Sequence, residues 1–253
     1  PMSGNRLLRS TAVFSAMTFL SRLSGLVRDQ VYAAVFGATA AMDIFFIAFR
    51  IPNFMRRLSA EGSFSMAFVP VLAEYKEKHG QEAVKELIDR VTGTLAAALL
   101  VVTALVLLLA PQLAFLIASK YTGEHHDMLA EMLRITFPYA LFISLASLVG
   151  SVLNSYQRFA IPALSPILLN LSMIAAAWLA FVSGASVMAL AWGVFVAGIL
   201  QLVFQLPALA KLGLMPRPKL GLAHAGVRKI MKLMVPTLFG SSVVQFNLLF
   251  NTW

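Results

Sequence analysis

Six arginines lie within or beside apolar runs of the sequence, where ionised side chains are rare. They are Arg22, Arg28, Arg50, Arg56, Arg57 and Arg134. Placing an arginine at the centre of a bilayer costs roughly 2.5–3.5 kcal/mol, so several of them together indicate a function. The guanidinium group is a planar fork of N–H donors that matches phosphate and carboxylate groups. The arginines therefore predict that an anionic ligand binds inside the membrane.

The arginines do not all have the same interpretation. Arg22 lies near the middle of its apolar run, too deep for its side chain to reach the membrane surface easily, which favours a binding role. Arg134 stands at the start of an apolar run, where a long side chain extends to the interface. Arg50 and Arg57 are two helical turns apart and share a face with Asp43. For these two, a structural ion pair and a binding role both stay open.

Helical rise gives each charged residue a depth. If a first span starts near residue 8 on the inner side, Arg22 lies ~20 Å and Arg28 ~30 Å along it. The second span returns from near residue 41, so Asp43 falls at the outer end, level with Arg28. Arg56 and Glu61 fall near the inner end. We therefore expect the first two spans to line one cavity, with cations at three depths and an acidic residue near each end.

Composition supports a membrane protein with several spans. The chain is 59% hydrophobic and 12% charged, whereas soluble domains carry about 25% charged residues. Residues 91–119 contain no charge, and a run of about 20 apolar residues already spans the hydrocarbon core as a helix. The absence of cysteine excludes disulfides, thiol catalysis and thiolate metal sites.

Hydropathy and helix breakers predict six spans, the start of a seventh, and an interfacial helix over 64–78. The spans cover roughly 8–36, 41–58, 87–117, 132–155, 161–182 and 186–208, and the seventh runs from near Lys229 to Trp253. The chain then divides into an N-terminal transmembrane lobe (1–208), a cytoplasmic inter-lobe linker and candidate hinge (209–232), and the start of a C-terminal lobe (233–253). Because the last span stops at Trp253, we expect these residues to belong to a longer chain.

Lysine and arginine mark one side of the membrane. They gather at the N-terminus and in 71–90, 155–161 and 209–232, whereas the intervening loops carry only Lys120. Positively charged loops stay in the cytoplasm, so we expect a cytoplasmic N-terminus. This topology accounts for the net charge of +9 without a nucleic-acid partner.

Three long segments resemble the lipid II flippase family of the MurJ/MviN type. They are SRLSGLVRDQVYAAVFGATAAMDIFFIAF (21–49), RIPNFMRRLSAEGSFSMAFVPVLAEYK (50–76) and RITFPYALFISLASLVGSVLNSYQRFAIPALSPILLN (134–170). The similarity is free of gaps over long stretches, covers nearly the whole chain and corresponds to the N-terminal half of the family's protein. It implies an all-α polytopic membrane protein with the multidrug/oligosaccharidyl-lipid/polysaccharide exporter fold, in which two six-helix lobes are related by pseudo-symmetry.

The resemblance also implies a function and residue roles. Family members move an undecaprenyl-diphosphate-linked peptidoglycan precursor, lipid II, across the bacterial inner membrane, and they are transporters rather than enzymes. The family's cavity arginines in the first span match Arg22 and Arg28, and its acidic residue in the second span matches Asp43. The Arg and Glu of its RR…AEG motif match Arg56 and Glu61.

These observations lead to one hypothesis for transport. Arg22 and Arg28 bind the diphosphate, and Arg56 helps to capture it near the inner mouth of the cavity. Asp43 pairs with Arg28 when the cavity is empty, which limits the cost of an unpaired buried charge. Gly25 is a candidate bend in the first span. We expect no metal or cofactor, and the expected partners are lipid II, membrane lipids, the remaining C-terminal lobe and other cell-wall synthesis proteins.

Other functions fit the sequence less well. A drug or cation exporter of this fold would favour acidic cavity residues, whereas a flippase for another anionic polyprenyl-linked saccharide fits the arginines and stays the alternative. A metalloenzyme would draw on EHHDMLAE (124–131), but the adjacent His125 and His126 lack the i, i+4 spacing that directs two histidines to one ion. We therefore expect 124–131 to be a solvated outer loop. A purely structural scaffold leaves the arginines unexplained.

Overall fold

A computed structural model describes residues 4–60 and 63–236, and these ranges contain helices and connecting turns but no strand. Helix α1 (Gly4–Phe36) is one uninterrupted helix, which passes through Gly25. It ends at Gly37, whose positive φ of 61° turns the chain into α2 (Ala40–Ala60). Helix α3 (Ser63–Lys78) follows. These bounds match the three helices predicted for this part of the chain to within a few residues.

The predicted third span is divided into two helices. Helix α4 (Gly80–Leu108) begins well before residue 87, and α5 (Ala110–Ile117) begins after a break at Leu109. Leu109 leaves the helical conformation, with φ −96° and ψ 11°. Pro111 lies in the first turn of α5, where a missing backbone N–H is tolerated. The prediction of one continuous helix over 87–117 is therefore wrong.

The outer loop predicted over 124–131 is also wrong, because these residues form the first turns of α6 (Glu124–Thr136). Glu124 and Asp127 lie in the first turn, where carboxylates interact favourably with the positive end of the helix dipole. Pro138 then separates α6 from α7 (Tyr139–Ser155). The remaining helices are α8 (Ala160–Ser183), α9 (Met188–Val203) and α10 (Leu206–Lys211), and residues 225–236 are helical as well.

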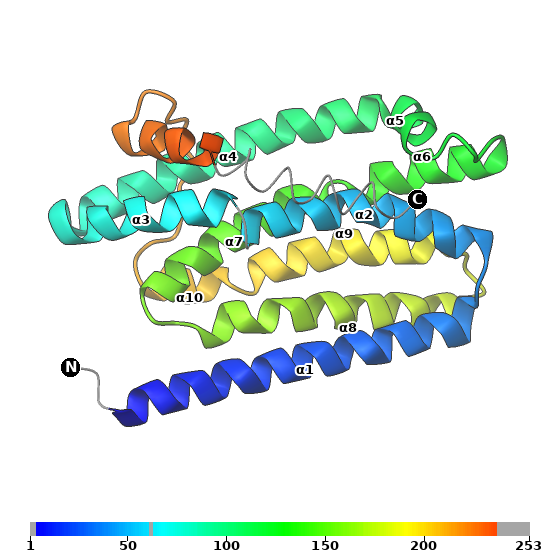
Figure 1. Ribbon diagram of the computed structural model, residues 1–253, viewed down its shortest axis with the longest axis horizontal. Coiled ribbons are helices and arrows are strands. Elements are labelled where there is room, and N and C mark those ends of the chain that lie inside the picture. Colours follow the sequence, from blue (N-terminus) through cyan, green and yellow to red (C-terminus); the bar gives the residue numbers. More distant parts are fainter. Residues whose placement is uncertain (1–3, 61–62, 237–253) are drawn as a thin grey trace.

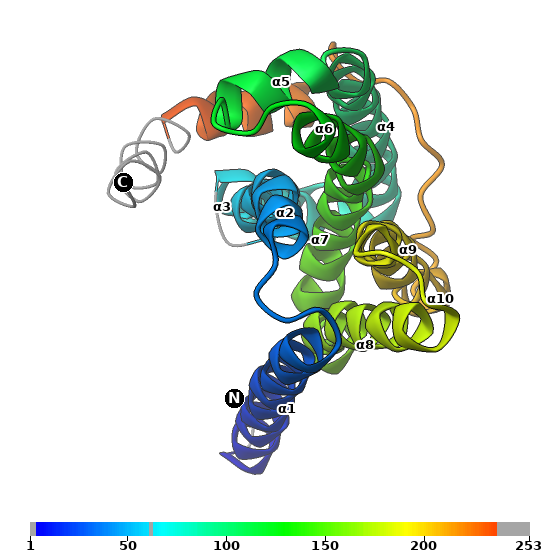
Figure 2. The ribbon, with the colours of Figure 1, turned by 90° about the vertical axis from the view of Figure 1, so that its right-hand side faces the viewer.

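The helices run roughly alongside one another and enclose a space on one side. Figure 1 shows α1 and α8 side by side along the lower edge of the molecule, and these two helices are in direct contact. Viewed along the helices in Figure 2, α1, α8, α7 and α6 follow an open arc, and α2 lies on its inner side. Helix α2 contacts α6 and α7. This arrangement places the arginines of α1 and α2 on the same concave side of the arc.

Two apolar clusters hold the helices together. One joins α2, α6, α7, α8 and α9 around fully buried residues such as Phe45, Leu133 and Tyr139. The other packs α3 against α4, α7 and the helical residues 225–236, with Phe68, Leu72 and Ile88 at its centre. Helix α3, predicted as an interfacial helix, therefore buries one face in protein.

Apolar side chains also cover much of the outer surface. Large residues such as Phe115, Leu116, Trp178 and Phe181 are exposed, as expected where a surface faces lipid. Four described stretches are long and apolar enough to cross a membrane: Gly80–Leu108, Glu124–Ser155, Ala160–Ser183 and Met188–Lys211. Helices α1 and α2, which carry the cavity arginines, are not among them. The all-α, polytopic class predicted from the sequence is confirmed.

The predicted linker is fastened to α4 rather than free. The carboxylate of Asp89, which is buried, accepts hydrogen bonds from the backbone N–H of Arg217 (2.8 Å) and from Lys85 Nζ (2.5 Å). Lys219 Nζ donates to Glu86 at 2.9 Å. Gly93 is required here, because a Cβ atom would lie only 2.2 Å from the backbone oxygen of Lys219. We call this set of contacts between residues 85–94 and 217–221 the α4 clamp.

Candidate functional site

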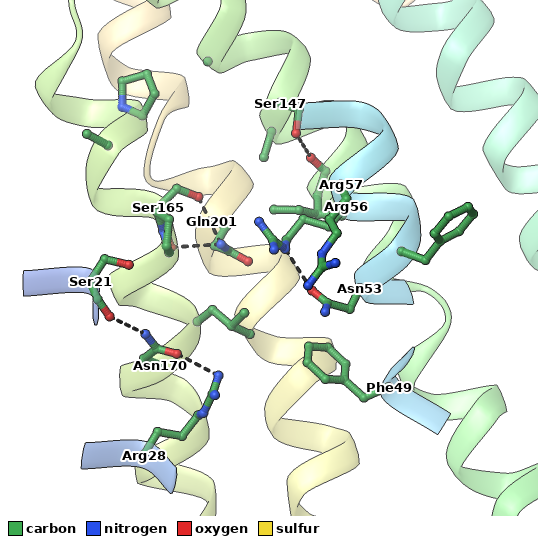
Figure 3. Close-up of a pocket in the computed structure, with 18 of the residues that line it drawn as sticks. Ser21, Arg28, Phe49, Asn53, Arg56, Arg57, Ser147, Ser165, Asn170 and Gln201 are labelled. Carbon is green, nitrogen blue, oxygen red and sulfur yellow. Dashed lines mark hydrogen bonds between the residues drawn. The ribbon is translucent and has the colours of Figure 1, made fainter. Parts of the chain in front are cut away.

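A cavity of about 1330 Å³ opens among α1, α2, α7, α8 and α9. Its lining includes five of the six arginines singled out in the sequence, namely Arg22, Arg28, Arg50, Arg56 and Arg57. These side chains come from α1 and α2, whereas serine and amide side chains from α7, α8 and α9 line other parts of the wall. Figure 3 shows arginines from both elements directed into the same space. The expectation that the first two helices line one cavity is confirmed by this geometry.

Arg28 contacts three side chains at the cavity. Its Nε and Nη2 atoms donate to one carboxylate oxygen of Asp29 at 2.9 and 2.7 Å, and its Nη1 donates to Asn170 Oδ1 at 3.0 Å. The guanidinium carbon lies 5.7 Å from the centre of the Tyr32 ring, within the range of a cation–π contact. Three of its five N–H donors are used in these bonds, so two remain for a ligand among the described contacts.

Arg22 lies almost two helical turns before Arg28 and lines the same cavity. Its side chain is exposed, and within the described residues it forms no ion pair. A solvated guanidinium that lines a cavity can direct its N–H donors to an incoming anion. Arg22 therefore has the chemistry expected of a binding residue, and no ion pair among the described residues accounts for its position.

Helix α2 contributes arginines through its last three turns. Arg56 Nε donates to Asn53 Oδ1 at 3.0 Å, one turn earlier on the same helix. Arg50 and Arg57 also line the cavity, and neither forms an ion pair with Asp43 within the described residues. Of the two interpretations left open for these arginines, the structural pair with Asp43 is therefore not formed here.

The structure tests the predicted position of only one of the two acidic residues expected to flank the cavity, Asp43. Asp43 is exposed in the first turn of α2, where its charge stabilises the helix N-terminus. It does not pair with Arg28, whose carboxylate partner is Asp29, so that part of the expected arrangement is corrected. Asp29 is the next residue in sequence and reaches the Arg28 guanidinium directly. Glu61 lies outside the described residues.

The sixth arginine has a structural role. Arg134, in the last turn of α6, donates from Nε to the backbone oxygen of Leu107 at 3.1 Å. This carbonyl is one of the last in α4, where the helix leaves backbone oxygens without intrahelical partners. Arg134, which the sequence predicts to extend to the membrane interface, bonds this helix end and is not among the residues that line the cavity.

Amide side chains form a second part of the wall, and the sequence predicts two of them, Asn170 and Gln201, to form hydrogen bonds between helices rather than to contact a ligand. Gln201 Nε2 donates to the backbone oxygen and the hydroxyl of Ser165 at 2.9 and 3.0 Å, so it joins α9 to α8 as expected. Asn170 joins α8 to α1 through Ser21 and Ser24. Both amides nevertheless line the cavity as well, together with Asn53 of α2. An amide within an otherwise apolar span was the signal that could have placed them there.

The cavity is suited to holding an anion rather than a metal ion. Its charged lining consists of arginines, which donate hydrogen bonds and do not ligate cations. In residues 4–60 and 63–236, no cluster of three or more histidine, aspartate or glutamate residues is arranged to hold a metal. His126, one of the two adjacent histidines, instead contacts the backbone oxygen of Pro111 through Nε2 at 3.0 Å.

The sequence of this chain is similar to a protein family and to individual proteins of known name. The sequence model of the lipid II flippase MurJ family matches residues 32–253. A Burkholderia cenocepacia protein named lipid II flippase MurJ is 44% identical, and the alignment covers 97% of this chain and 49% of that protein. A Vibrio cholerae protein named probable lipid II flippase MurJ is 43% identical, and the alignment covers 98% of this chain and 49% of that protein. The chain thus spans about half the length of the curated relatives it matches.

A solved structure leads to the same family. The chain superimposes on a structure of lipid II flippase MurJ in an inward closed conformation with a TM-score of 0.79 and 27% identity. The match covers 94% of this chain and 49% of that one. The family model, the relatives and the fold agree with the resemblance found in the sequence. The chain therefore belongs to the lipid II flippase MurJ family.

Proposed function

We propose that this chain forms the N-terminal lobe of a flippase that moves lipid II from the cytoplasmic to the periplasmic leaflet of a bacterial inner membrane. The observation that carries the proposal is the cavity lined by five arginines in a chain that belongs to the MurJ family. The protein acts as a transporter and not as an enzyme. Its partners are lipid II, the surrounding membrane lipids, the C-terminal lobe and other proteins of cell-wall synthesis.

The arginines hold the diphosphate of the lipid. Arg22 and Arg28 on α1 bind it within the cavity, and Arg56 on α2 helps to capture it. Each guanidinium offers paired N–H donors that match two phosphate oxygens, which is a stronger contact than a point charge makes. Asp43 and Glu61 act as gating or ion-pairing residues at the two ends of the path. The polyprenyl tail stays in lipid while the saccharide and peptide cross through the cavity.

Alternating access moves the bound headgroup. The two lobes rock about a site near the middle of the membrane, so that the cavity opens first to one side and then to the other. The N-terminus lies in the cytoplasm, as the lysine and arginine distribution predicts. An anionic headgroup moving outward travels with the membrane potential, which contributes about 2.3 kcal/mol per elementary charge per 100 mV.

The test is lipid II translocation by the full-length protein in cells depleted of their own flippase. We expect wild type to restore translocation and growth, whereas Arg22→Ala and Arg28→Ala reach the membrane at normal levels and fail to do so. Full activity of both alanine variants, with normal insertion, would rule out the binding role. In proteoliposomes, translocation of another anionic polyprenyl-linked saccharide in preference to lipid II would favour that substrate instead.

A further inference from the structure

The amide of Asn170 stands between α8 and the arginine-bearing face of α1. Its Nδ2 donates to the backbone oxygen of Ser21 at 3.2 Å and to the hydroxyl of Ser24 at 2.8 Å. Its Oδ1 accepts a hydrogen bond from Arg28 Nη1 at 3.0 Å. Figure 3 shows these contacts linking Ser21, Asn170 and Arg28 along one edge of the cavity.

The orientation of this amide is fixed by its surroundings. A backbone carbonyl oxygen only accepts hydrogen bonds, so the group that faces Ser21 must be the amide nitrogen. The Ser24 hydroxyl donates its own proton to the Ser21 carbonyl at 2.8 Å and is therefore left as an acceptor for Asn170. The amide oxygen is consequently directed toward Arg28. The reversed amide would place two acceptors against each other at Ser21.

Asn170 also differs from the other groups that contact Arg28. Asp29 is the neighbouring residue on the same helix, and its side chain is 61% exposed, so it moves with α1 and is well solvated. Asn170 is buried and belongs to α8, 142 residues away along the chain. It therefore ties the guanidinium to the wall of the cavity. A neutral amide does this without cancelling the positive charge that an anion requires.

We propose that Asn170 is a positioning residue for Arg28: it holds the guanidinium so that its two remaining N–H donors face the diphosphate. The proposal rests on the function proposed above, in which Arg28 binds that group. Asn170 itself does not contact the ligand. It lowers the entropy that Arg28 loses on binding, because the side chain is already held in one orientation before the ligand arrives.

A double-mutant cycle in the full-length protein separates this role from simple packing. Binding of undecaprenyl diphosphate in nanodiscs is measured for wild type, Asn170→Ala, Arg28→Ala and the double variant. A hydrogen bond to a charged group is worth enough that we expect Asn170→Ala alone to weaken binding by about 5- to 20-fold. In the Arg28→Ala background the same change should have less than about a 2-fold effect, because the partner is gone.

Gln205→Ala is the matched control. Gln205 is a buried amide at the same cavity that bonds the backbone oxygens of Ala146 and Gln201 and makes no contact with Arg28. We expect Gln205→Ala to change the affinity for undecaprenyl diphosphate by the same factor in the wild-type and the Arg28→Ala backgrounds. An effect of Asn170→Ala that is likewise equal in both backgrounds would show a purely structural role and overturn the proposal.

The remaining outcomes distinguish this proposal from the proposed function. If Arg28→Ala abolishes binding and Asn170→Ala changes nothing, Asn170 is not a positioning residue, while the binding role of Arg28 stands. If neither variant affects binding, the diphosphate role of Arg28 fails. A structure of the Asn170→Ala protein then decides the positioning role: a guanidinium that keeps its place overturns it, and one that moves away from α8 supports it.

Discussion

The cavity and the α4 clamp are both rich in cations, but the cations of the two regions have different partners. In the clamp, Arg90 and Lys219 each bond Glu86, at 2.7 and 2.9 Å, and Lys85 bonds the buried Asp89. In the cavity, Arg28 has one carboxylate partner, and Arg22, Arg50 and Arg57 have none within the described residues. In the clamp, Lys85, Arg90 and Lys219 all pair with carboxylates. In the cavity, Arg28 pairs with Asp29 and also contacts the Asn170 amide and the Tyr32 ring.

We propose that this difference separates charges that serve folding from charges that serve binding. A cation paired with a carboxylate has already satisfied most of its interactions and fastens one segment to another. A cation held by a neutral amide keeps its charge for a ligand. The two groups should therefore respond differently to substitution, with clamp variants losing stability and cavity variants losing binding.

The largest effect is expected from breaking the clamp at Asp89. Asp89→Ala removes a buried carboxylate and leaves the backbone N–H of Arg217 and the Lys85 ammonium without their acceptor. We expect the free energy of unfolding to fall by about 2–4 kcal/mol, measured by thermal or denaturant unfolding in detergent.

Asp127→Ala is the control for that substitution. Its side chain is 85% exposed and contacts only His126 among the described charged groups, so we expect a change within about 0.5 kcal/mol. Equal losses in the two variants would show that burial of the clamp carboxylate is not what stabilises the segment.

The next effect concerns the cavity. Arg22→Ala should weaken binding of undecaprenyl diphosphate by about 10-fold or more, because it removes a charge-assisted contact. Its free energy of unfolding should stay within about 0.5 kcal/mol of wild type, since the side chain is exposed and forms no ion pair in the described part of the chain. Binding and unfolding are measured on the same Arg22→Ala protein. A large loss of stability would show that this cavity arginine contributes to folding, as the clamp residues do.

A smaller effect is expected at Gly25, the candidate bend. Helix α1 passes through this residue without a break, and an added Cβ would lie 3.6 Å from Asn170 Nδ2, an ordinary contact distance. Gly25→Ala should leave stability unchanged or raise it by up to about 1 kcal/mol, because alanine favours the helix. Thermal unfolding checks this, and loss of translocation by a stable variant would instead support bending at Gly25 during transport.

The smallest effect concerns an exposed ion pair between α3 and the helical residues 225–236. The hydrogen bond from Lys229 holds the pKa of the Glu74 carboxyl below its usual range. A lowered pKa in the folded state contributes stability above the unfolded pKa, and this contribution is lost as pH falls through the folded value. Unfolding temperature should therefore fall slightly more between neutral and acidic pH in wild type than in Glu74→Gln. Identical profiles would mean that this pair contributes nothing to stability.

Much of the helical framework was predictable from local sequence. Apolar runs and breakers placed α1, α2 and α3 within a few residues, because helical periodicity and helix breakers are properties of the local segment. The break at Leu109 was missed, since Pro111 lies inside a long uncharged run that is apolar enough to read as one span. Residues 124–131 were misassigned because their polar composition suits an exposed helix as well as a loop.

The sequence by itself determined that this protein is helical, crosses the membrane and concentrates arginines on its first two helices, because these properties follow from residue type and spacing. Only the tertiary structure decided the partners: Asp29 rather than Asp43 for Arg28, Asn170 from α8 on the same guanidinium, and α4 as the anchor of the linker. Most of these contacts join residues more than 100 positions apart, and hydrogen bonds depend on distances of about 3 Å. Such distances are fixed by helix packing, which periodicity along the chain does not specify.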